Sequence, residues 1–129
     1  MNSDYIIGIG TDICDVERIS NMLSKYGNNF LNKVFSEEEI KYCSVLPNPA
    51  QHYAARFAAK EAMSKAFGTG FVDTITLKSF SVLNHKNGMP YAVFDENAKK
   101  VFDELGAKKM SISLSHLKDY AVAFAILSR

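Results

Sequence analysis

Residues 56–70, with the sequence RFAAKEAMSKAFGTG, constrain the fold more than any other stretch of the chain. This stretch is rich in alanine, has four charged side chains and ends in glycines. Upstream, Asn48 is typical of a helix N-cap and Pro49 of the first helical position, while Gly68 is typical of a C-terminal stop. These signals predict one long helix over residues 49–67.

Apolar side chains cover about half the circumference of this predicted helix, at about 100° per residue. The opposite arc is a charged strip made of Lys60, Glu61, Ser64 and Lys65. Phe57 lies within the strip and needs a cover, which indicates a central helix whose charged strip faces a cleft. The alternative is a surface helix on which Glu61 and Lys65 form an ordinary i, i+4 pair, worth about 0.3–0.5 kcal/mol.

A carboxylate lies on a glycine-lined face of the first predicted strand, residues 5–12. Alternation with a period of two puts Gly8, Gly10 and Asp12 on the same face. Glycines in a strand often mark close approach by a ligand or by another backbone, so Asp12 is a candidate site residue. The alternative is that Asp12 is the N-cap of the following helix, since Asp15 comes three residues later.

The helix predicted after this strand ends at Gly27 and carries two basic residues on one face. Arg18 and Lys25 are seven residues apart, and Met22 lies at the edge of their face. A basic rim with a methionine contact suits the docking of an acidic helical partner. A solvated helix face is the alternative explanation.

The middle of the chain predicts shorter elements. Residues 30–35 read as an irregular or short helical connection. Ser36 and Glu39 match a capping box, which indicates the start of a helix that ends near Leu46. After the central helix, a strand over residues 74–86 is expected, followed by the Asn87-Gly88 turn, which is a strong hairpin signal.

The last third of the chain completes an α+β pattern. A strand over residues 91–94 returns from the turn, a helix runs from Asp95 to Gly106, and strands over 110–115 and 120–127 follow, with His116 at the rim of their hairpin. We therefore expect a single domain, residues 1–129, in which antiparallel strands wrap around the central helix. The strict βαβ alternation of a doubly wound fold is missing from this pattern.

Composition argues against several classes of partner. The net charge of +1 provides no global field for nucleic acid or for an anionic membrane surface. No stretch approaches the roughly 18 apolar residues of a membrane span, and we expect no signal peptide because Asp4 interrupts the start. Cys14 and Cys43 are isolated cysteines without metal-ligand spacing, expected to stay reduced in the cytosol.

The common motifs for dinucleotides, nucleotide phosphates, serine nucleophiles and zinc do not occur in the sequence. One or two carboxylates near lysines suit Mg²⁺, which keeps several waters and takes substrate phosphate oxygens. Glu61 is a candidate metal ligand, and Lys65, one turn later, a candidate phosphate contact. The 68–70 turn lets a bulky ligand lie against the backbone. Such a site supports phosphoryl-type transfer by positioning and charge neutralisation.

Three segments together resemble the bacterial holo-[acyl-carrier-protein] synthases, the small members of the 4'-phosphopantetheinyl transferase family: residues 7–13 (IGIGTDI), 56–70 and 113–116 (SLSH). The resemblance covers nearly the whole chain, including its length and the segment 87–90 (NGMP). The strand aspartate and the Lys-Glu-Ala-x-x-x-Lys helix are specific in combination. The segment from about 27 to 52 varies, which leaves partner preference open.

The resemblance implies a reaction in which coenzyme A donates its 4'-phosphopantetheine arm to a serine of apo acyl carrier protein, releasing adenosine 3',5'-bisphosphate. It implies a cytoplasmic enzyme of fatty acid biosynthesis. Asp12 and Glu61 become ligands of Mg²⁺, and Asp12, Glu61 and Lys65 become the catalytic residues. Whether Glu61 deprotonates the serine directly or through a metal-bound water stays open.

The resemblance also implies binding residues and an assembly. Coenzyme A contacts are implied for Arg56, Lys60, Lys65, Gly68 and His116. Carrier-protein docking is implied for Arg18, Met22 and Lys25. Family members form homotrimers with the coenzyme site between subunits, which would also cover Phe57.

Two other functions are compatible with the residues. A non-catalytic coenzyme A or nucleotide sensor would keep the phosphate-binding cations but would not need two metal-ligand carboxylates. A structural interaction module would use Asp12 only as a cap and Glu61–Lys65 only as a surface pair, and Glu61→Ala would then abolish nothing.

Overall fold

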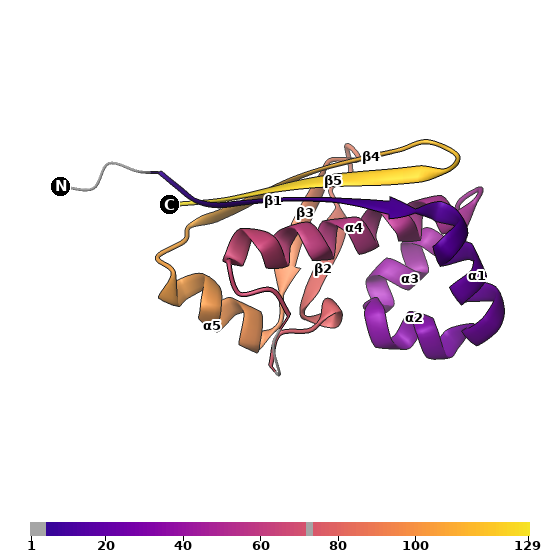
Figure 1. Cartoon of the computed structure of the whole chain (residues 1–129), viewed down its shortest axis with the longest axis horizontal. Helices are drawn as coiled ribbons and strands as arrows, with labels where there is room; N and C mark the ends of the chain where they lie inside the picture. The colour runs from indigo at the N-terminus through magenta and orange to yellow at the C-terminus, as the bar shows by residue number, and fades with distance from the viewer. Residues whose placement is uncertain (1–4, 72–73) are drawn as a thin grey trace.

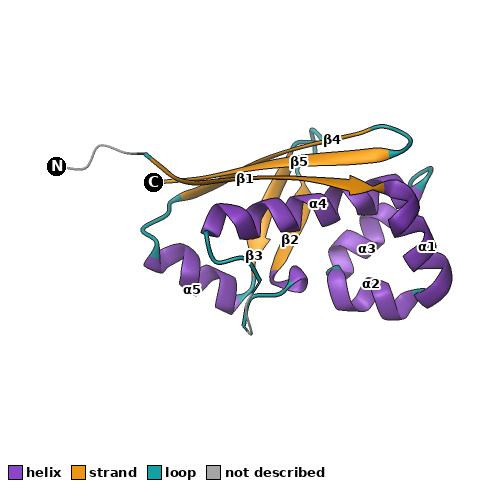
Figure 2. Cartoon of the chain, viewed as in Figure 1, coloured by secondary structure: helices purple, strands orange, loops and turns teal. Residues whose placement is uncertain are grey.

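The computed structural model describes residues 5–71 and 74–129, which form an α+β structure (Figures 1 and 2). In chain order the elements are β1 (Ile6–Asp15), α1 (Val16–Tyr26), α2 (Asn28–Val34), α3 (Glu37–Ser44), α4 (Pro49–Phe67), a 3₁₀ helix (Leu77–Ser79), β2 (Phe80–Asn84), β3 (Pro90–Phe94), α5 (Glu96–Glu104), β4 (Lys109–His116) and β5 (Tyr120–Ser128). The predicted fold class and the central helix are confirmed.

Helix α4 has the predicted bounds and is buried on nearly all sides. Pro49 occupies the first turn, and Gly68 ends the helix in a left-handed conformation with φ of 80°. The predicted side-chain cap at its start is wrong, because Asn48 itself is left-handed (φ 53°) and its side chain makes no capping hydrogen bond. Proline, which needs no backbone donor there, begins the helix without help from a cap.

A three-stranded antiparallel sheet, in the order β1-β5-β4, runs along one side of α4 (Figure 1). The glycines of β1 lie directly against the helix backbone. A Cβ atom on Gly8 would lie 1.9 Å from the Ala66 carbonyl oxygen, and one on Gly10 would lie 1.8 Å from the Ala62 carbonyl oxygen. The close approach that the glycines predicted is therefore made by the backbone of α4.

The remaining strands, β2 and β3, form a separate antiparallel hairpin. The predicted strand over residues 74–86 is too long, and its beginning also lies beside residues that the structure does not describe. A 3₁₀ helix precedes β2 because Thr76 and Ser79 cap each other, with the Thr76 amide donating to Ser79 Oγ at 3.0 Å. The predicted turn is confirmed, with Gly88 at φ of 91°.

Helices α1, α2 and α3 gather at one end of α4, and α5 lies at the other (Figure 1). Strand β1 continues past Asp12 to Asp15, whose carboxylate accepts from the Glu17 amide at 2.9 Å and caps α1. Asp12 is therefore not the helix cap. The Ser36–Glu39 capping box of α3 is confirmed.

Phe57 is covered by its own chain. Its side chain is 8% exposed, and the Arg18 guanidinium of α1 lies over the ring, 5.5 Å from the centroid. A neighbouring subunit is therefore not needed to cover Phe57, contrary to the expectation from the resemblance. Among the described residues, no helix is long and apolar enough to span a bilayer.

Candidate active site

The strand carboxylate and the central helix meet where β1 passes α4. The Lys65 ammonium donates to the Thr11 carbonyl oxygen at 2.9 Å and to Asp12 Oδ1 at 3.2 Å. These two side chains remain open to solvent, with exposed fractions of 52% for Lys65 and 21% for Asp12. Lys65 thus pairs across to β1, and none of the ion pairs in the described ranges joins it to Glu61.

Glu61 lies close enough to Asp12 for their charges to interact. Partial burial raises the pKa of Glu61 above its usual value, and repulsion from Asp12 adds to the increase. Lys65 and Arg18 oppose that increase. Because the two carboxylates repel each other, a cation bound between them would stabilise the site.

The donor set fits Mg²⁺ better than a zinc site. Asp12 and Glu61 supply hard carboxylate oxygens, and within residues 5–71 and 74–129 there is no group of three or more His, Cys, Asp or Glu side chains that could hold a metal. Mg²⁺ is commonly held by one or two carboxylates, with waters and substrate phosphate oxygens as its other ligands. A third protein ligand is therefore not required.

A second part of the site surrounds Arg56, near the start of α4. The guanidinium donates from Nη1 to the His52 carbonyl oxygen at 3.4 Å and from Nη2 to the side-chain oxygen of Asn84, and it lies 4.7 Å from the Tyr42 ring centroid. Arg56 is 3% exposed. None of the ion pairs among the described residues involves it, and its Nε has no hydrogen-bond partner. A buried cation of this kind is unfavourable until an anion joins it.

Arg56 lines a cavity of about 180 Å³, which we call the Arg56 pocket. Its lining residues are Tyr42, His52, Ala55, Arg56, Asn84, Gly88, Pro90, Leu114 and His116. No carboxylate is among them, and the buried Nδ1 of His116 has no hydrogen-bond partner within the described structure. The pocket is therefore suited to an anion that accepts hydrogen bonds.

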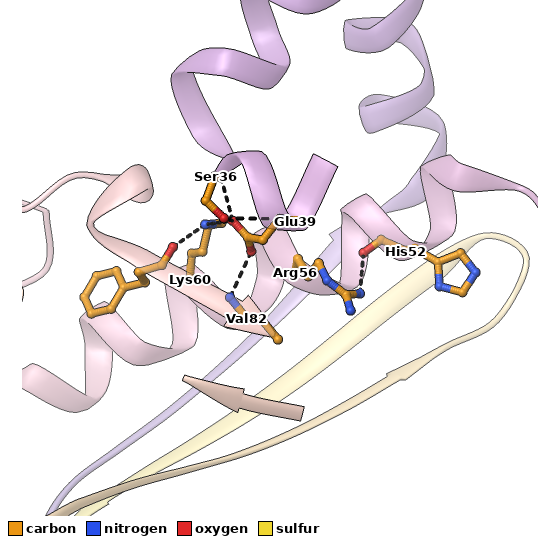
Figure 3. A network of polar contacts seen from close by, with 7 residues as sticks. Ser36, Glu39, His52, Arg56, Lys60 and Val82 are labelled. Atoms are coloured by element: carbon orange, nitrogen blue, oxygen red, sulfur yellow. Dashed lines mark hydrogen bonds and ion pairs between the residues drawn. The ribbon is translucent and has the colours of Figure 1, made fainter. Parts of the chain in front are cut away.

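Lys60, predicted to contact coenzyme A, lies elsewhere (Figure 3). Its side chain is fully buried, and its ammonium forms an ion pair with Glu39 Oε1 at 2.8 Å and donates to the Phe80 carbonyl oxygen. The other Glu39 oxygen accepts from the Val82 amide at 3.0 Å. Burial lowers the pKa of Lys60, while Glu39 opposes that effect. Lys60 thus joins α4 to α3 and β2 and has no free surface for a ligand.

The remaining predicted residues lie on the surface. Gly68 ends α4, and a Cβ atom added there would meet nothing within 4 Å. Met22 of α1 lines a groove of about 370 Å³ together with Tyr26, Asn29, Phe30 and Lys33. Lys25 lies beside that groove over the Tyr26 ring, 5.3 Å from its centroid. Arg18 has an additional structural role because it packs on Phe57.

Tyr42, His52 and Asn84 also line the Arg56 pocket, and no motif in the sequence pointed to them. His52 precedes Arg56 by four residues, so helical spacing alone could have placed the two on one face of α4. Tyr42 and Asn84 come from α3 and β2, and only the tertiary packing brings them to the pocket.

Comparisons with known proteins agree with this geometry. A family model of the 4'-phosphopantetheinyl transferase superfamily matches residues 8–125. The holo-[acyl-carrier-protein] synthase of Ruminiclostridium cellulolyticum is 46% identical over 121 residues, which span 93% of this chain and 90% of the relative.

Two solved structures are similar over nearly their full length. The crystal structure of the synthase from Neisseria meningitidis has a TM-score of 0.88 and 31% identity, covering 96% of this chain and 99% of that one. The synthase from Bacillus anthracis, solved in complex with coenzyme A (3',5'-ADP), has a TM-score of 0.80 and 31% identity, covering 97% of this chain and 98% of that one. The chain belongs to the 4'-phosphopantetheinyl transferase superfamily.

Proposed function

We propose that the protein is a holo-[acyl-carrier-protein] synthase, which transfers the 4'-phosphopantetheine group of coenzyme A to a serine of apo acyl carrier protein. The observation that carries this proposal is that one helix, α4, contributes side chains to two places that suit phosphate groups. Helix α4 presents Glu61 and Lys65 to Asp12, and one face nearer its start presents Arg56 to a pocket without carboxylates. Family membership and the named relatives support the same reaction.

Asp12 and Glu61 are the residues that would hold Mg²⁺. When bound, the ion neutralises the pyrophosphate and the charge that develops on the leaving phosphate. Lys65, held on the Thr11 carbonyl and Asp12, binds a pyrophosphate oxygen and stabilises the departing adenosine 3',5'-bisphosphate. Arg56 and His116 bind a further phosphate of coenzyme A through their unpartnered nitrogens. The substrate thus lies along α4.

In the transfer, the serine oxygen forms a bond to the phosphorus that carries the pantetheine arm. The bond from that phosphorus to the oxygen of the adenosine phosphate breaks. The serine proton goes to the Glu61 carboxylate, which acts as the general base in this proposal. The proposed role of this chain is therefore to orient two phosphate groups and to remove one proton.

The carrier protein docks on α1 in this proposal. Lys25 and Arg18 supply positive charge, and the groove beside Met22 accepts an apolar side chain of an acidic helix. Lys25→Glu is expected to raise the KM for carrier protein more than the KM for coenzyme A, because Lys25 makes no contact in the core. Equal effects on both KM values would contradict this docking face.

We further propose that the enzyme is a cytoplasmic homotrimer whose sites lie between subunits. The face of the three-stranded sheet that points away from α4 carries exposed apolar side chains on paired strands: Ile9, Ile13, Phe124 and Ile126. Thr11 lies on this face and Asp12 follows it on the edge strand β1, so a second copy covering the face comes near the carboxylates. Phe124→Lys is expected to yield a smaller species in light scattering and to reduce turnover. A fully active monomer would overturn the interface-site proposal.

Incubation with coenzyme A, Mg²⁺ and apo acyl carrier protein tests the function directly. Mass spectrometry should show that the carrier protein gains one phosphopantetheine, and that Asp12→Asn and Glu61→Gln abolish the gain while remaining folded. Coenzyme A binding without transfer would favour a non-catalytic module instead. Near-normal transfer by both variants would contradict the assigned site.

A further inference from the structure

A second histidine lies in the Arg56 pocket beside the proposed phosphate contacts. His52, near the start of α4, meets the His116 ring of β4 edge to face, with ring centroids 5.0 Å apart. Both rings line the cavity of about 180 Å³ that also contains the Arg56 guanidinium. Figure 3 shows His52 and Arg56 on the same stretch of α4, with Arg56 between His52 and the Lys60–Glu39 pair.

The ionisable groups that line the pocket with His52 are cationic or neutral. They are Arg56 from α4, His116 from β4 and Tyr42 from α3, and no carboxylate lines this part of the described structure. Burial lowers the pKa of His52, the positive charges of His116 and Arg56 lower it further, and the Pro47 carbonyl opposes them. In the protein without an anion, His52 is therefore neutral near pH 7.

The unpartnered atoms of the pocket match a phosphate monoester. Arg56 is 3% exposed with a free Nε, and the buried Nδ1 of His116 also has no partner in the described structure. A phosphate monoester has a second pKa near 6, so it carries close to two negative charges at pH 7. One guanidinium neutralises only one of these charges. A proton on the neighbouring imidazoles can neutralise the other.

We propose that His52 is an additional phosphate-binding residue of the Arg56 pocket and that its imidazole takes up a proton when a phosphate monoester dianion binds. The inference rests on the proposed function, because coenzyme A and adenosine 3',5'-bisphosphate both carry such a group. The dianion stabilises the His52 imidazolium, which raises the pKa of His52. Binding therefore takes up protons, and affinity increases as the pH falls from 8 toward 6.

Proton NMR can follow His52 as a function of pH in the full chain, because the chain has only three histidines: His52, His85 and His116. The probe is adenosine 3',5'-bisphosphate at saturating concentration. The His52 pKa should lie below its ordinary value in the free protein and rise when the probe binds. His85 is exposed and stacked on Tyr91, outside the pocket, so its ring signals should not move when the probe binds. A His52 pKa that the bound probe leaves unchanged overturns the proposal.

His52→Phe keeps an aromatic ring against His116 but removes the second ionisable group. Affinity for the probe is compared at pH 6.5 and pH 8 by calorimetry, and the ionisation of the ligand is common to all variants. The ratio of the affinity at pH 6.5 to the affinity at pH 8 should be about threefold larger for the wild type than for His52→Phe. His85→Phe is the matched control and should keep the wild-type ratio. A wild-type ratio in His52→Phe overturns the proposal.

Two further ligands separate the possible failures. Dephospho-coenzyme A lacks the monoester, so it should leave the His52 pKa unchanged, and an equal shift would overturn the proposal. Inorganic phosphate should raise the His52 pKa if the anion alone is recognised, whereas no shift at saturation would contradict direct phosphate binding. Failure of the wild-type protein to bind coenzyme A would overturn the proposed function and this inference together. Binding that leaves His52 unaffected overturns the inference alone.

Discussion

Lys60 and Glu61 are neighbours on α4, yet their side chains lie in opposite environments. Lys60 is fully buried and paired with Glu39, and its ammonium also donates to a backbone carbonyl. Glu61 is partly exposed beside Asp12, with a raised pKa and no ion-pair partner among the described residues. The Lys60–Glu39 pair holds three elements together, whereas the other region places two carboxylates side by side, with Lys65 paired, within the described structure, to Asp12 alone. Here a buried charge that has an ion-pair partner stabilises the fold, whereas a charge without such a partner indicates a ligand-binding site.

The largest effect on stability is expected from Lys60→Met. Removing one partner of a buried ion pair leaves Glu39 as an unpaired buried carboxylate, so the free energy of unfolding should fall by about 3–5 kcal/mol. Denaturant unfolding measures the change. The double variant Lys60→Met/Glu39→Gln removes both charges and should recover part of the loss. A decrease below about 1 kcal/mol for the single variant would contradict the role of this pair.

Glu61→Gln should have the opposite effect to Lys60→Met: the protein should lose turnover and keep its stability. Loss of a carboxylate that serves as a metal ligand and proton acceptor should reduce kcat at least about a hundredfold. The free energy of unfolding should not decrease, because Glu61 forms no ion pair to lose. Steady-state kinetics and denaturant unfolding on one preparation check both statements. Loss of both activity and stability would make Glu61 a structural residue.

Lys65→Ala should have a smaller effect on turnover, a decrease of about tenfold. Its ammonium is half exposed, so breaking the pair with Asp12 should change the free energy of unfolding by about 1 kcal/mol or less. Lys99→Ala is a matched control, because Lys99 forms an exposed i, i+4 pair with Asp103 on α5. Equal kinetics for Lys65→Ala and Lys99→Ala would remove the proposed role of Lys65.

The smallest expected effect concerns the pH dependence of stability. The pKa of Glu61 is raised in the folded protein, so its ionised form is disfavoured there. Wild-type stability relative to Glu61→Gln should therefore fall as the pH rises above the ordinary glutamate value. Thermal melting without divalent cations should give equal melting temperatures near pH 4 and a higher one for the variant at pH 7. A lower melting temperature for the variant at pH 7 would contradict the repulsion between Glu61 and Asp12.

Much of the fold follows from local signals. Pro49 and Gly68 bound α4, the Ser36–Glu39 box begins α3, and Gly88 marks the hairpin. The exceptions also arise from local signals, but there two such signals compete for the same residues. At Thr76, reciprocal capping with Ser79 favours a 3₁₀ turn over the extended strand that β-branched residues predict.

The candidate site was predictable only in part. Asp12, Glu61 and Lys65 were identified from spacing and resemblance, and the structure brings them together. Arg56 and His116, for which the resemblance implied coenzyme A contacts, line one pocket, and the sequence did not show that His52 joins them. Lys60 shares the charged arc of the helix with Glu61, and the resemblance implied a coenzyme A contact for it. That arc is wide, and α3 and β2 cover the part that carries Lys60.

By itself, the sequence determined the periodicities of the helices and strands, the glycine-lined face of β1 and the residue types available for chemistry. These depend on backbone conformation and on neighbours a few positions away. The tertiary structure alone decided which charges are buried, which find partners and which stay open to a ligand. Glu39 reaches Lys60 and Lys65 reaches Asp12 from distant parts of the chain. Burial and pairing set the energy of a charge, and both depend on packing between elements.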